Sequence, residues 1–354
     1  MPSGSRLALV DQTTDAVLAI DGDRGAAARS ACCDTPMSHT LQSALDPAGR
    51  QAALIYHLWL TMFWVTAAVF TVVVGAIAVA VIIGRRRRRA DASSHPSEFA
   101  LSTAVFAAVA ATVGILFVLL AVTVRTANAI TSLGEPSAIS ISITGHQWWW
   151  EVEYEDAVAS QRVTTANEIH IPIGRPVVFK VSSHDVIHSF WVPNLHGKRD
   201  LVPGITTAIW LQADRPGTYR GQCAEFCGRQ HAHMAFEVVA ESQSEFDRWL
   251  DDQRHAAAQP QNDQERRGQT VFVTSRCSMC HKVRGTEAYG TVGPDLTHIA
   301  SRRTLAAGSV PNARGHLAGW IVDPQSVKPG NVMPRSPLAP DDLQALVAYL
   351  EILR

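Results

Sequence analysis

Two long uncharged stretches constrain the fold more than any other feature of this sequence. The first runs from residue 58 to 83 and the second from residue 99 to 124, and neither contains a charged residue. Each is longer than the roughly 20 residues that an α-helix needs to cross the hydrocarbon core of a membrane. A buried core helix of that length would normally show a polar face, which both stretches lack. We therefore predict two transmembrane helices within residues 51–125.

The loop between these stretches contains five consecutive arginines, Arg85 to Arg89. Alone, such a run could be a nucleic-acid or sorting patch, but between two spans it indicates the cytoplasmic side of the membrane. The net charge of −1 also gives no field that would attract nucleic acid. We expect a multi-pass protein of the bacterial inner membrane, in contact with lipid, with both termini and the soluble domains on the periplasmic side.

Residues 1–50 are expected to form a mobile N-terminal extension, unless the start codon has been placed too early. No apolar segment precedes Cys32 and Cys33, so neither a signal peptide nor a lipoprotein site is supported. We assign no role to these two cysteines.

The remaining chain divides into a β-rich and a helical part. Residues 138–241 contain short segments rich in β-branched and aromatic residues, separated by Gly and Pro turns, which predict an antiparallel β-sandwich. Residues 242–262 are polar and predict a short helix running into a linker. Residues 263–354 read as helices and loops and end in an amphipathic helix, "DDLQALVAYLEILR".

The two soluble parts carry opposite net charges. Residues 138–250 contain 9 Lys and Arg against 13 Asp and Glu, a net −4, whereas residues 263–354 contain 11 against 8, a net +3. Opposite signs favour docking of the two parts, or steering of an external partner. The alternative is that these are solvated faces without a special role.

Potential metal ligands are most concentrated in "QCAEFCGRQHAHM", residues 222–234. Cys223 and Cys227 are followed by His231 and Met234, and His188 ends an upstream predicted strand. A disulfide would leave both histidines and the methionine unused. Zinc could take two cysteines and two histidines, but it has no use for a thioether, and the C-x3-C-x3-H spacing is not that of common zinc fingers.

Copper fits this set of donors better than zinc or a disulfide does. Thiolate, thioether and imidazole ligands together select copper, and one Cys, two His and a weakly bound Met make a mononuclear electron-transfer site. The second cysteine allows two thiolates to bridge a pair of coppers, each also bound by one histidine. We therefore predict a copper electron-transfer site on the sandwich.

The motif "CSMCH", residues 277–281, is the signature for covalent attachment of c-type haem. Cys277 and Cys280 would form the thioether bonds, and His281 would supply one axial ligand. A redox C-x-x-C needs no following His, and a zinc site would need a second pair of ligands. Haem c is therefore the favoured cofactor of this part of the chain.

The second axial haem ligand is expected further along the chain. Met333 lies in "PGNVMPRSPL", a loop far enough downstream to cross the haem face, and a Met/His pair raises the haem potential. Met279 lies inside the attachment motif and cannot reach the distal side. His298 and His316 are less favoured alternatives.

Several motifs resemble known families. The pattern C-x-E-x-C-x3-H-x2-M, with "GHQWWWEVEY", "DVIHSFWVP" and the hairpin before them, resembles subunit II of cytochrome c oxidase over roughly residues 43–240. The stretches "RRGQTVFVTSRCSMCH", "GPDL" and "LVAYLEIL" resemble class I cytochromes c. A haem domain fused behind such a copper domain is similar to the caa-type haem–copper oxidases.

This resemblance implies a multi-domain fold: a two-helix transmembrane hairpin, an all-β cupredoxin-like sandwich over residues 138–241 and an all-α class I cytochrome c domain over residues 263–354. It also implies a binuclear CuA centre. The implied ligands are the side chains of His188, Cys223, Cys227, His231 and Met234 and the backbone carbonyl of Glu225. In the family, the Glu225 side chain would also reach a magnesium ion shared with subunit I.

Two further residues acquire roles only through the resemblance. Three adjacent tryptophans beside a membrane could form an interfacial belt or belong to the sandwich core. In the family, the position of Trp148 is the electron entry point beneath a docked cytochrome c. Glu98 opens the second span, where it is either an interfacial residue or the mouth of a proton path. The Trp and Pro that usually follow this Glu in the family are absent here.

These features together predict the electron-input subunit of a proton-pumping terminal oxidase. Electrons would come from cytochrome c or a quinol–cytochrome c reductase and pass through haem c and CuA to subunit I, where O2 is reduced to water. Subunit III is an expected further partner, and the chain alone is expected to perform no O2 chemistry. The alternative is a membrane-tethered copper and haem protein that serves another reductase. Nitrous oxide reductase would need a larger, His-rich chain, and quinol oxidase subunits lack the copper ligands.

Overall fold

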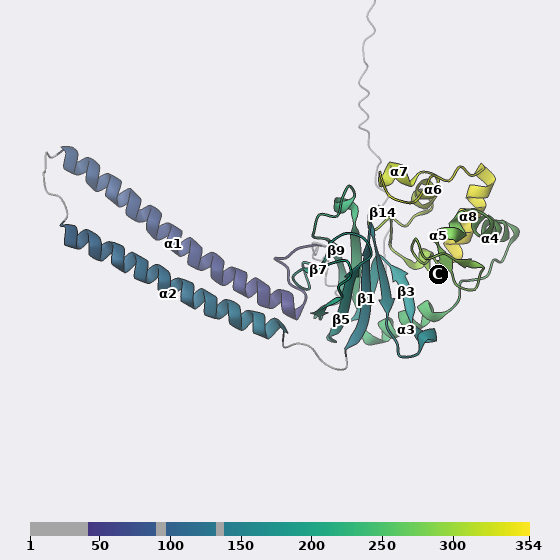
Figure 1. The fold of residues 1–354 in the computed structure, drawn as a ribbon, viewed down its shortest axis with the longest axis horizontal. Coiled ribbons are helices and arrows are strands. Elements are labelled where there is room, and N and C mark those ends of the chain that lie inside the picture. The colour runs from purple at the N-terminus through teal and green to yellow at the C-terminus, as the bar shows by residue number, and fades with distance from the viewer. Residues whose placement is uncertain (1–41, 90–96, 132–137) are drawn as a thin grey trace, which may run out of the picture. The chain divides into compact units, whose positions relative to one another are not determined.

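The computed structural model describes residues 42–89, 97–131 and 138–354. Cys32 and Cys33, and the predicted extension up to residue 41, lie outside the described residues. The described chain forms a helical hairpin, a two-sheet sandwich and a helical C-terminal region (Figure 1). This order confirms the predicted fold class.

The hairpin consists of α1 (Arg50–Arg89) and α2 (Glu98–Thr131), which lie side by side (Figure 1). Both uncharged stretches fall within these helices, and both helices are long and apolar enough to cross a membrane. Large apolar side chains are exposed along them, for example Phe70 (67%) and Phe106 (74%). Such exposure is unfavourable in water and favourable in lipid.

The sandwich is built from two five-stranded sheets, with strand orders β3-β2-β1-β5-β8 and β4-β10-β9-β6-β7. The strands of the first sheet are β1 (Ile139–His146), β2 (Trp149–Tyr154), β3 (Val163–Ala166), β5 (Val177–Ser183) and β8 (Thr207–Leu211). Those of the second are β4 (Glu168–Pro172), β6 (His188–Trp191), β7 (Arg199–Leu201), β9 (Gly217–Cys223) and β10 (Ala235–Glu241). A short 3-10 helix, η1 (Ala159–Gln161), connects β2 to β3.

The sheets are mixed rather than purely antiparallel, which corrects the sequence-based expectation. β1 pairs in parallel with β5, and β4 pairs in parallel with β10. The partners in each pair are separated by several other strands, so the chain can return in the same direction. Alternating turn and strand signals in a sequence do not reveal such long-range pairings.

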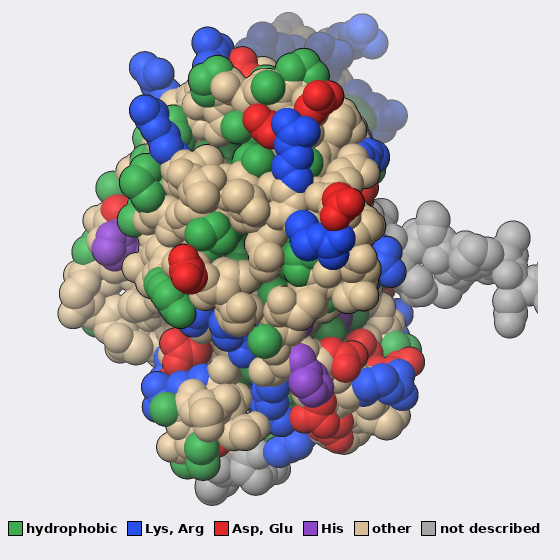
Figure 2. Space-filling view, turned by 90° about the vertical axis from the view of Figure 1, so that its right-hand side faces the viewer, with side chains coloured by type: hydrophobic (Ala, Val, Ile, Leu, Met, Phe, Trp, Pro, Cys, Tyr) green, Lys and Arg blue, Asp and Glu red, His purple; other side chains and the backbone are tan. Residues whose placement is uncertain are grey.

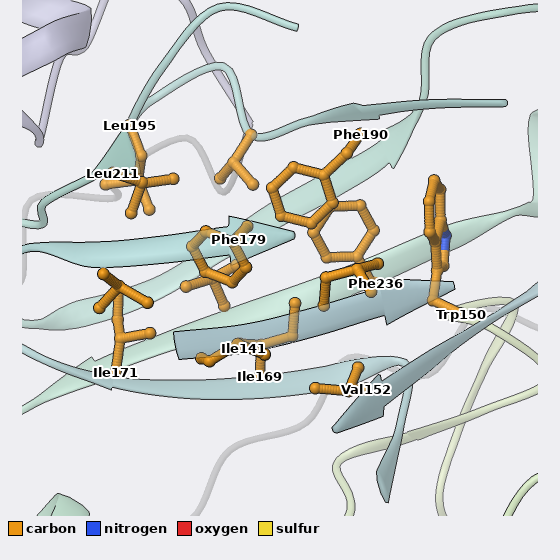
Figure 3. Close-up of a cluster of buried hydrophobic side chains, with 14 of the residues drawn as sticks. Ile141, Trp150, Val152, Ile169, Ile171, Phe179, Phe190, Leu195, Leu211 and Phe236 are labelled. Atoms are coloured by element: carbon orange, nitrogen blue, oxygen red, sulfur yellow. The ribbon is translucent and has the colours of Figure 1, made fainter. Parts of the chain in front are cut away.

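The sandwich core is an alternating set of apolar side chains from both sheets (Figure 3). Ile141 and Ile143 of β1 are fully buried, as the two-residue period of a strand requires. Phe190 stacks on Phe236 with ring centroids 4.7 Å apart, and Trp150 packs edge-on against both rings. Phe190 lies on β6 and Phe236 on β10, the two strands that flank β9 in the second sheet.

The chain just before α1 packs on the sandwich. Asp46 pairs with Arg215 at 2.8 Å, and Gly49 forms a β-bridge with Ala213. A Cβ on Gly49 would lie 2.5 Å from the carbonyl oxygen of Gln212, so this close approach requires glycine. The described end of the predicted mobile extension, residues 42–50, is therefore held against the sandwich.

Helix α3 (Gln243–Arg254) follows the last strand. Ser242 caps its first turn, and Glu245 completes a capping box. Phe246 is buried against the sandwich core, and Trp249 packs beside it. Part of the predicted linker is thus a helix that belongs to the sandwich.

The C-terminal region contains α4 (Asp263–Thr274), α5 (Cys277–Cys280), α6 (Arg314–Val322), α7 (Pro324–Val327), α8 (Pro340–Ile352) and the 3-10 helix η3 (Ile299–Ser301). Two short ribbons pair β11 (Lys282–Val283) with β12 (Ala288–Tyr289) and β13 (Thr304–Leu305) with β14 (Val310–Pro311). Helices α4 and α8 pack at Gly268, where a Cβ would lie 2.0 Å from the carbonyl oxygen of Ala345.

The net charges of the soluble parts do not translate into large patches on the face shown in Figure 2. There, Lys and Arg side chains are interspersed with Asp, Glu and apolar groups. Net charge alone therefore does not define a partner surface on this face.

Candidate metal and haem sites

Two neighbouring strands of the second sheet position the cysteine-containing loop. β9 ends at Cys223 and β10 begins at Ala235, so the loop that connects them contains Cys227, the 3-10 helix η2 (His231–His233) and Met234. β6 pairs with β9 on its other side, with Phe190 opposite Cys223, and this brings His188 to the same edge. The sandwich thus gathers residues from positions 188 to 234 at one end.

The sulfur and imidazole atoms at this edge form a compact set. The Sγ atoms of Cys223 and Cys227 are 3.7 Å apart, and neither cysteine is in a disulfide. Nδ1 of His188 lies 3.8 Å from Cys223 Sγ, and Nδ1 of His231 lies 3.6 Å from Cys227 Sγ. The Sδ atom of Met234 lies 3.8 Å from Cys227 Sγ. Each thiol therefore has its own imidazole, and one thiol also has a thioether.

His188 is held in one orientation by its neighbours. Its Nε2 donates to Asp185 Oδ1 at 2.8 Å, because a carboxylate can only accept, and this leaves Nδ1 free to bind a metal. On β1, Gly145 makes room for the ring, since a Cβ there would lie 2.8 Å from His188 Cδ2. The imidazole is fully buried, and its Nδ1 faces the thiols.

The two thiols interact strongly. The contact between the two thiols lowers the pKa of Cys223 and raises the pKa of Cys227. One thiol of the pair therefore ionises more readily than the other, and metal binding requires that both lose their protons. Two sulfurs this close, each beside an imidazole and shielded from water, fit a pair of soft metal ions.

Glu225 presents its backbone and its side chain to different neighbours. Its carbonyl oxygen lies 3.1 Å from Cys223 Sγ, within the cluster. Its carboxylate is half exposed and pairs with Lys198 at 3.4 Å. Only the backbone of Glu225 is therefore directed at the thiols.

Trp148 contacts the loop directly. It lies in the turn between β1 and β2, and its side chain is 9% exposed. Its Nε1 donates to the carbonyl oxygen of Cys227 at 2.9 Å, and Nε2 of Gln147 donates to the same oxygen at 2.7 Å. The indole is thus hydrogen-bonded to the backbone of one of the two cysteines.

The C-x-x-C-H motif forms α5 and the residue after it. Nδ1 of His281 donates to the carbonyl oxygen of Pro294 at 2.8 Å, and burial lowers the pKa of His281. The hydrogen bond at Nδ1 leaves Nε2 available as a ligand, and the lowered pKa favours the neutral ring that ligation requires. A Cβ on Gly293 would lie 2.6 Å from Cε1 of the ring, so glycine is needed beside it. Both cysteines of the motif are free thiols, which fits the attachment of haem.

Met333 lies in the loop between α7 and α8 and is half buried. Its backbone N–H donates to Asn331 Oδ1 at 2.8 Å, and its carbonyl accepts from Gln325 Nε2 at 3.0 Å. The two histidine alternatives are engaged elsewhere: His298 Nε2 lies 3.1 Å from the carbonyl of His255, and His316 Nδ1 lies 3.1 Å from that of Pro311.

Glu98 is the first residue of α2 and is exposed. Ser102 donates to its backbone carbonyl at 2.8 Å. This contact is local to α2, and within the described residues no hydrogen bond or ion pair joins Glu98 to the metal or haem motifs.

Comparisons with known proteins show the family of the chain. Residues 158–242 match the model of the periplasmic domain of cytochrome c oxidase subunit II, and residues 265–354 match the cytochrome c model. Cytochrome c oxidase subunit 2 of Alkalihalophilus pseudofirmus is 38% identical over 320 residues, which cover 88% of this chain and 91% of the relative. The chain belongs to the cytochrome c oxidase subunit 2 family.

Two further matches are less similar than this relative. Cytochrome c oxidase subunit 2 of Bacillus subtilis is 29% identical over 61% of this chain and 63% of its own length. The crystal structure of the periplasmic domain of subunit II of the Bradyrhizobium japonicum oxidase is 30% identical over 33% of this chain and 94% of its own, with a TM-score of 0.31. Subunit 2 family members belong to oxidoreductase complexes anchored in membranes, so this chain is a membrane oxidase subunit that associates with other oxidase subunits.

Two parts of the site were not found from the sequence. Asp185 lies three residues before His188, and this spacing near a candidate ligand was the available signal. Gly145 makes room for the same ring from β1, a strand of the other sheet, so the packing of the two sheets brings it near. Such supports depend on tertiary contacts that residue spacing does not contain.

Proposed function

We propose that this chain is the electron-input subunit of a proton-pumping cytochrome c oxidase. It would receive electrons from cytochrome c or a quinol–cytochrome c reductase and pass them to subunit I, where O2 is reduced to water. The observation that carries the proposal is the pair of buried thiols 3.7 Å apart, each beside its own imidazole, in a chain that also has a cytochrome c domain.

Two cofactors are assigned to the chain's own residues. A binuclear CuA centre would be held by His188, Cys223, Cys227, His231, Met234 and the carbonyl of Glu225. Haem c would be attached to Cys277 and Cys280, and His281 and Met333 would bind its iron. When bound, these groups supply one-electron transfer.

The protein's contribution is to hold these ligands rigidly and away from water. Cys223 and Cys227 are 2% and 3% exposed, and Met234 is fully buried. Asp185 fixes the ring of His188, and β9 fixes Cys223. A preorganised ligand set of this kind favours fast electron transfer, because the protein need not rearrange when the charge of the centre changes. Trp148, which is hydrogen-bonded to Cys227, would provide the electron entry point.

Surfaces near the membrane would receive subunit I and, we propose, subunit III. A groove lies between the start of α1 and the cysteine-containing loop and is lined by Ala52, Ile55, Trp191, His196, Lys198 and Ala224. Phe226, at the tip of the loop, is 77% exposed. In this arrangement the soluble parts lie on the periplasmic side, with Arg85–Arg89 in the cytoplasm.

We also propose the magnesium site and the proton path that the family implies. A magnesium ion shared with subunit I would have to compete with Lys198 for the Glu225 carboxylate. A proton path would begin at Glu98, whose exposure at the start of α2 is compatible with a channel mouth in a partner subunit.

Purification of the membrane complex tests the proposed function. We expect a many-span, haem-rich partner to co-purify, and Met333→Leu to alter the haem c spectrum through loss of the sulfur ligand. A chain isolated without an oxidase partner would instead favour a tethered electron-transfer protein that serves another reductase. An unchanged spectrum in Met333→Leu would remove the axial assignment.

A further inference from the structure

A buried lysine of the cytochrome c region contacts the backbone beside the cysteine-containing loop. Lys328 follows α7 and is 2% exposed, although lysines are seldom buried without a paired acid. Its Nζ donates to the carbonyls of Trp148 (2.7 Å), His233 (2.9 Å) and Ala306 (3.2 Å). Among residues 42–89, 97–131 and 138–354, no carboxylate forms an ion pair with it. Its burial is thus compensated by three carbonyl dipoles.

These three acceptors match the donors of a protonated amino group. Burial lowers the pKa of Lys328 to about 7, and the nearby Cys227 opposes this shift. Three acceptors also favour the charged form, because only an ammonium group has three N–H donors. A buried amine is costly, so its retention at this place points to a specific positional role.

The contact joins two parts of the chain that carry different candidate cofactors. Both acceptors outside the cytochrome c region belong to the sandwich: Trp148 lies in the turn between β1 and β2, and His233 lies in the cysteine-containing loop. The indole of Trp148 also donates to the carbonyl of Cys227. Lys328 and Ala306 belong to the cytochrome c region. Trp148 thus links Lys328 to the backbone of Cys227, a predicted copper ligand.

Neighbouring contacts hold the same surfaces together. Nε2 of Gln230 donates to the carbonyl of Pro329 at 2.8 Å, and the N–H of Ala235 donates to the carbonyl of Ala307 at 3.0 Å. Arg303 pairs with Glu237 at 3.0 Å, which joins opposite charges across the two parts. Lys328 lies within this set of contacts, and it is the buried charge among them.

The lysine is also tied to the predicted axial ligand of the haem. Nδ2 of Asn331 donates to the carbonyl of Lys328 at 2.6 Å, and Oδ1 of the same side chain accepts from the N–H of Met333 at 2.8 Å. One side chain thus links the backbone of Lys328 to that of Met333. Movement of Lys328 away from Trp148 would move the Met333 loop with it.

We propose that Lys328 is a positioning residue for electron transfer between the two cofactors. By donating to Trp148 and His233, it seats the Met333 loop of the cytochrome c domain on the cysteine-containing loop, and so fixes the separation and orientation of the haem and copper sites. This inference rests on the proposed function. Lys328 lies outside the motifs of the predicted copper and haem ligands, so those motifs give no indication of this role.

The test uses the intact oxidase complex with Lys328→Met, which keeps most of the side-chain volume and removes the donors. Arg266→Gln is the matched control, because it removes an exposed charge of the same region that pairs only locally with Asp263.

We expect the haem-to-copper electron-transfer rate to fall by at least about tenfold in Lys328→Met, since small misplacements carry large rate penalties. Copper content, haem content and the haem spectrum should be retained. Lys328→Arg, which keeps N–H donors, should recover part of the rate.

A second readout does not depend on turnover. Amide hydrogen exchange at Ala235, whose N–H crosses to Ala307, should accelerate in Lys328→Met and not in Arg266→Gln. An unchanged transfer rate together with unchanged exchange would overturn the proposal, and so would a slowed rate that Lys328→Arg does not improve at all.

Two further outcomes distinguish a failed assembly of the variant from a failure of the proposed function. If Lys328→Met fails to assemble, Gln230→Leu replaces it, since it removes the adjacent donor to Pro329; a severalfold slower transfer is then expected, and the parental rate would overturn the proposal. If the parent complex itself shows no haem-to-copper transfer, the proposed function fails rather than the role of Lys328 alone.

Discussion

At the scale of single residues, the candidate metal site depends on side chains that are not ligands. Asp185 fixes one tautomer of His188, Gly145 gives the ring its space, and Gln147 and Trp148 both donate to the carbonyl of Cys227. These contacts determine where the donor atoms lie before any metal binds. Their loss should therefore weaken binding without removing a ligand.

Asp185→Asn tests this support. The Asn amide oxygen is uncharged and accepts a hydrogen bond more weakly than the Asp carboxylate. The orientation and basicity of the His188 ring should therefore change. We expect copper affinity to fall by about 10–100-fold, the usual effect of removing a partner that orients a metal ligand. Competition with a copper chelator measures this, and Asp251→Asn, an exposed substitution on α3, is the control. Equal copper retention in both variants would contradict the assigned role.

A second buried cluster should give the sandwich a pH-dependent stability. His170 lies between Glu241 (2.9 Å) and Glu168 (3.3 Å), and its ring stacks on Trp249. Burial alone would lower the pKa of His170, but the hydrogen bonds and charges of the two glutamates raise it above 6.5. Tyr154 faces the same cluster through its hydroxyl, which bonds the backbone of His170.

The sign of this effect follows from the raised pKa. Stabilisation by protonated His170 is fully present below pH 6.5 and is lost as the pH rises through the higher folded-state pKa. We expect the denaturant midpoint, read from tryptophan fluorescence, to fall over that range in the parent. His170→Gln should flatten the change, whereas the exposed His316→Gln should not. A parental pH profile in His170→Gln would refute this account.

At the scale of elements, close backbone approach decides how the cytochrome c region packs. Helices α4 and α8 meet at Gly268, where any Cβ would lie 2.0 Å from a backbone oxygen of Ala345. Because backbone cannot yield as a flexible side chain can, the helices would have to separate. Phe272 and Tyr349, which pack across this contact, would then lose part of their burial.

Gly268→Ala should therefore lower the free energy of unfolding by about 1–3 kcal/mol, the usual cost of overpacking. Gly319→Ala is the matched control, since it lies in α6 with no atom within 4 Å of the added Cβ. That substitution should be neutral, or stabilising by up to about 1 kcal/mol, because alanine favours a helix. Thermal unfolding followed by haem absorption compares the two. Equal midpoints would show that the close approach is not required.

At the scale of the whole molecule, the features that could be predicted from the sequence are those set by local residue patterns. The uncharged stretches predicted the hairpin, the alternating apolar segments predicted the sandwich, and "CSMCH" predicted the haem-binding character of the last part, which the family comparison supports. The C-x-E-x-C-x3-H-x2-M spacing placed four donors on one loop, and the structure brings them together with His188. Local motifs are readable because their residues lie near one another in the chain.

Long-range contacts were not readable in this way. The parallel pairing of β1 with β5, the packing of residues 42–50 on the sandwich and the burial of Lys328 against Trp148 each join residues far apart in sequence. Lys328 in particular stands in a polar stretch that gives no sign of burial. Its environment is created by the docking of two domains, which no single segment specifies.

The central claim is that Cys223 and Cys227 together hold a pair of coppers. Copper analysis of the purified complex, comparing the parent with Cys223→Ser/Cys227→Ser, tests it most directly. We expect the double variant to lose two coppers per complex and to keep its haem c. Loss of one copper or none, or zinc in place of copper in the parent, would contradict it.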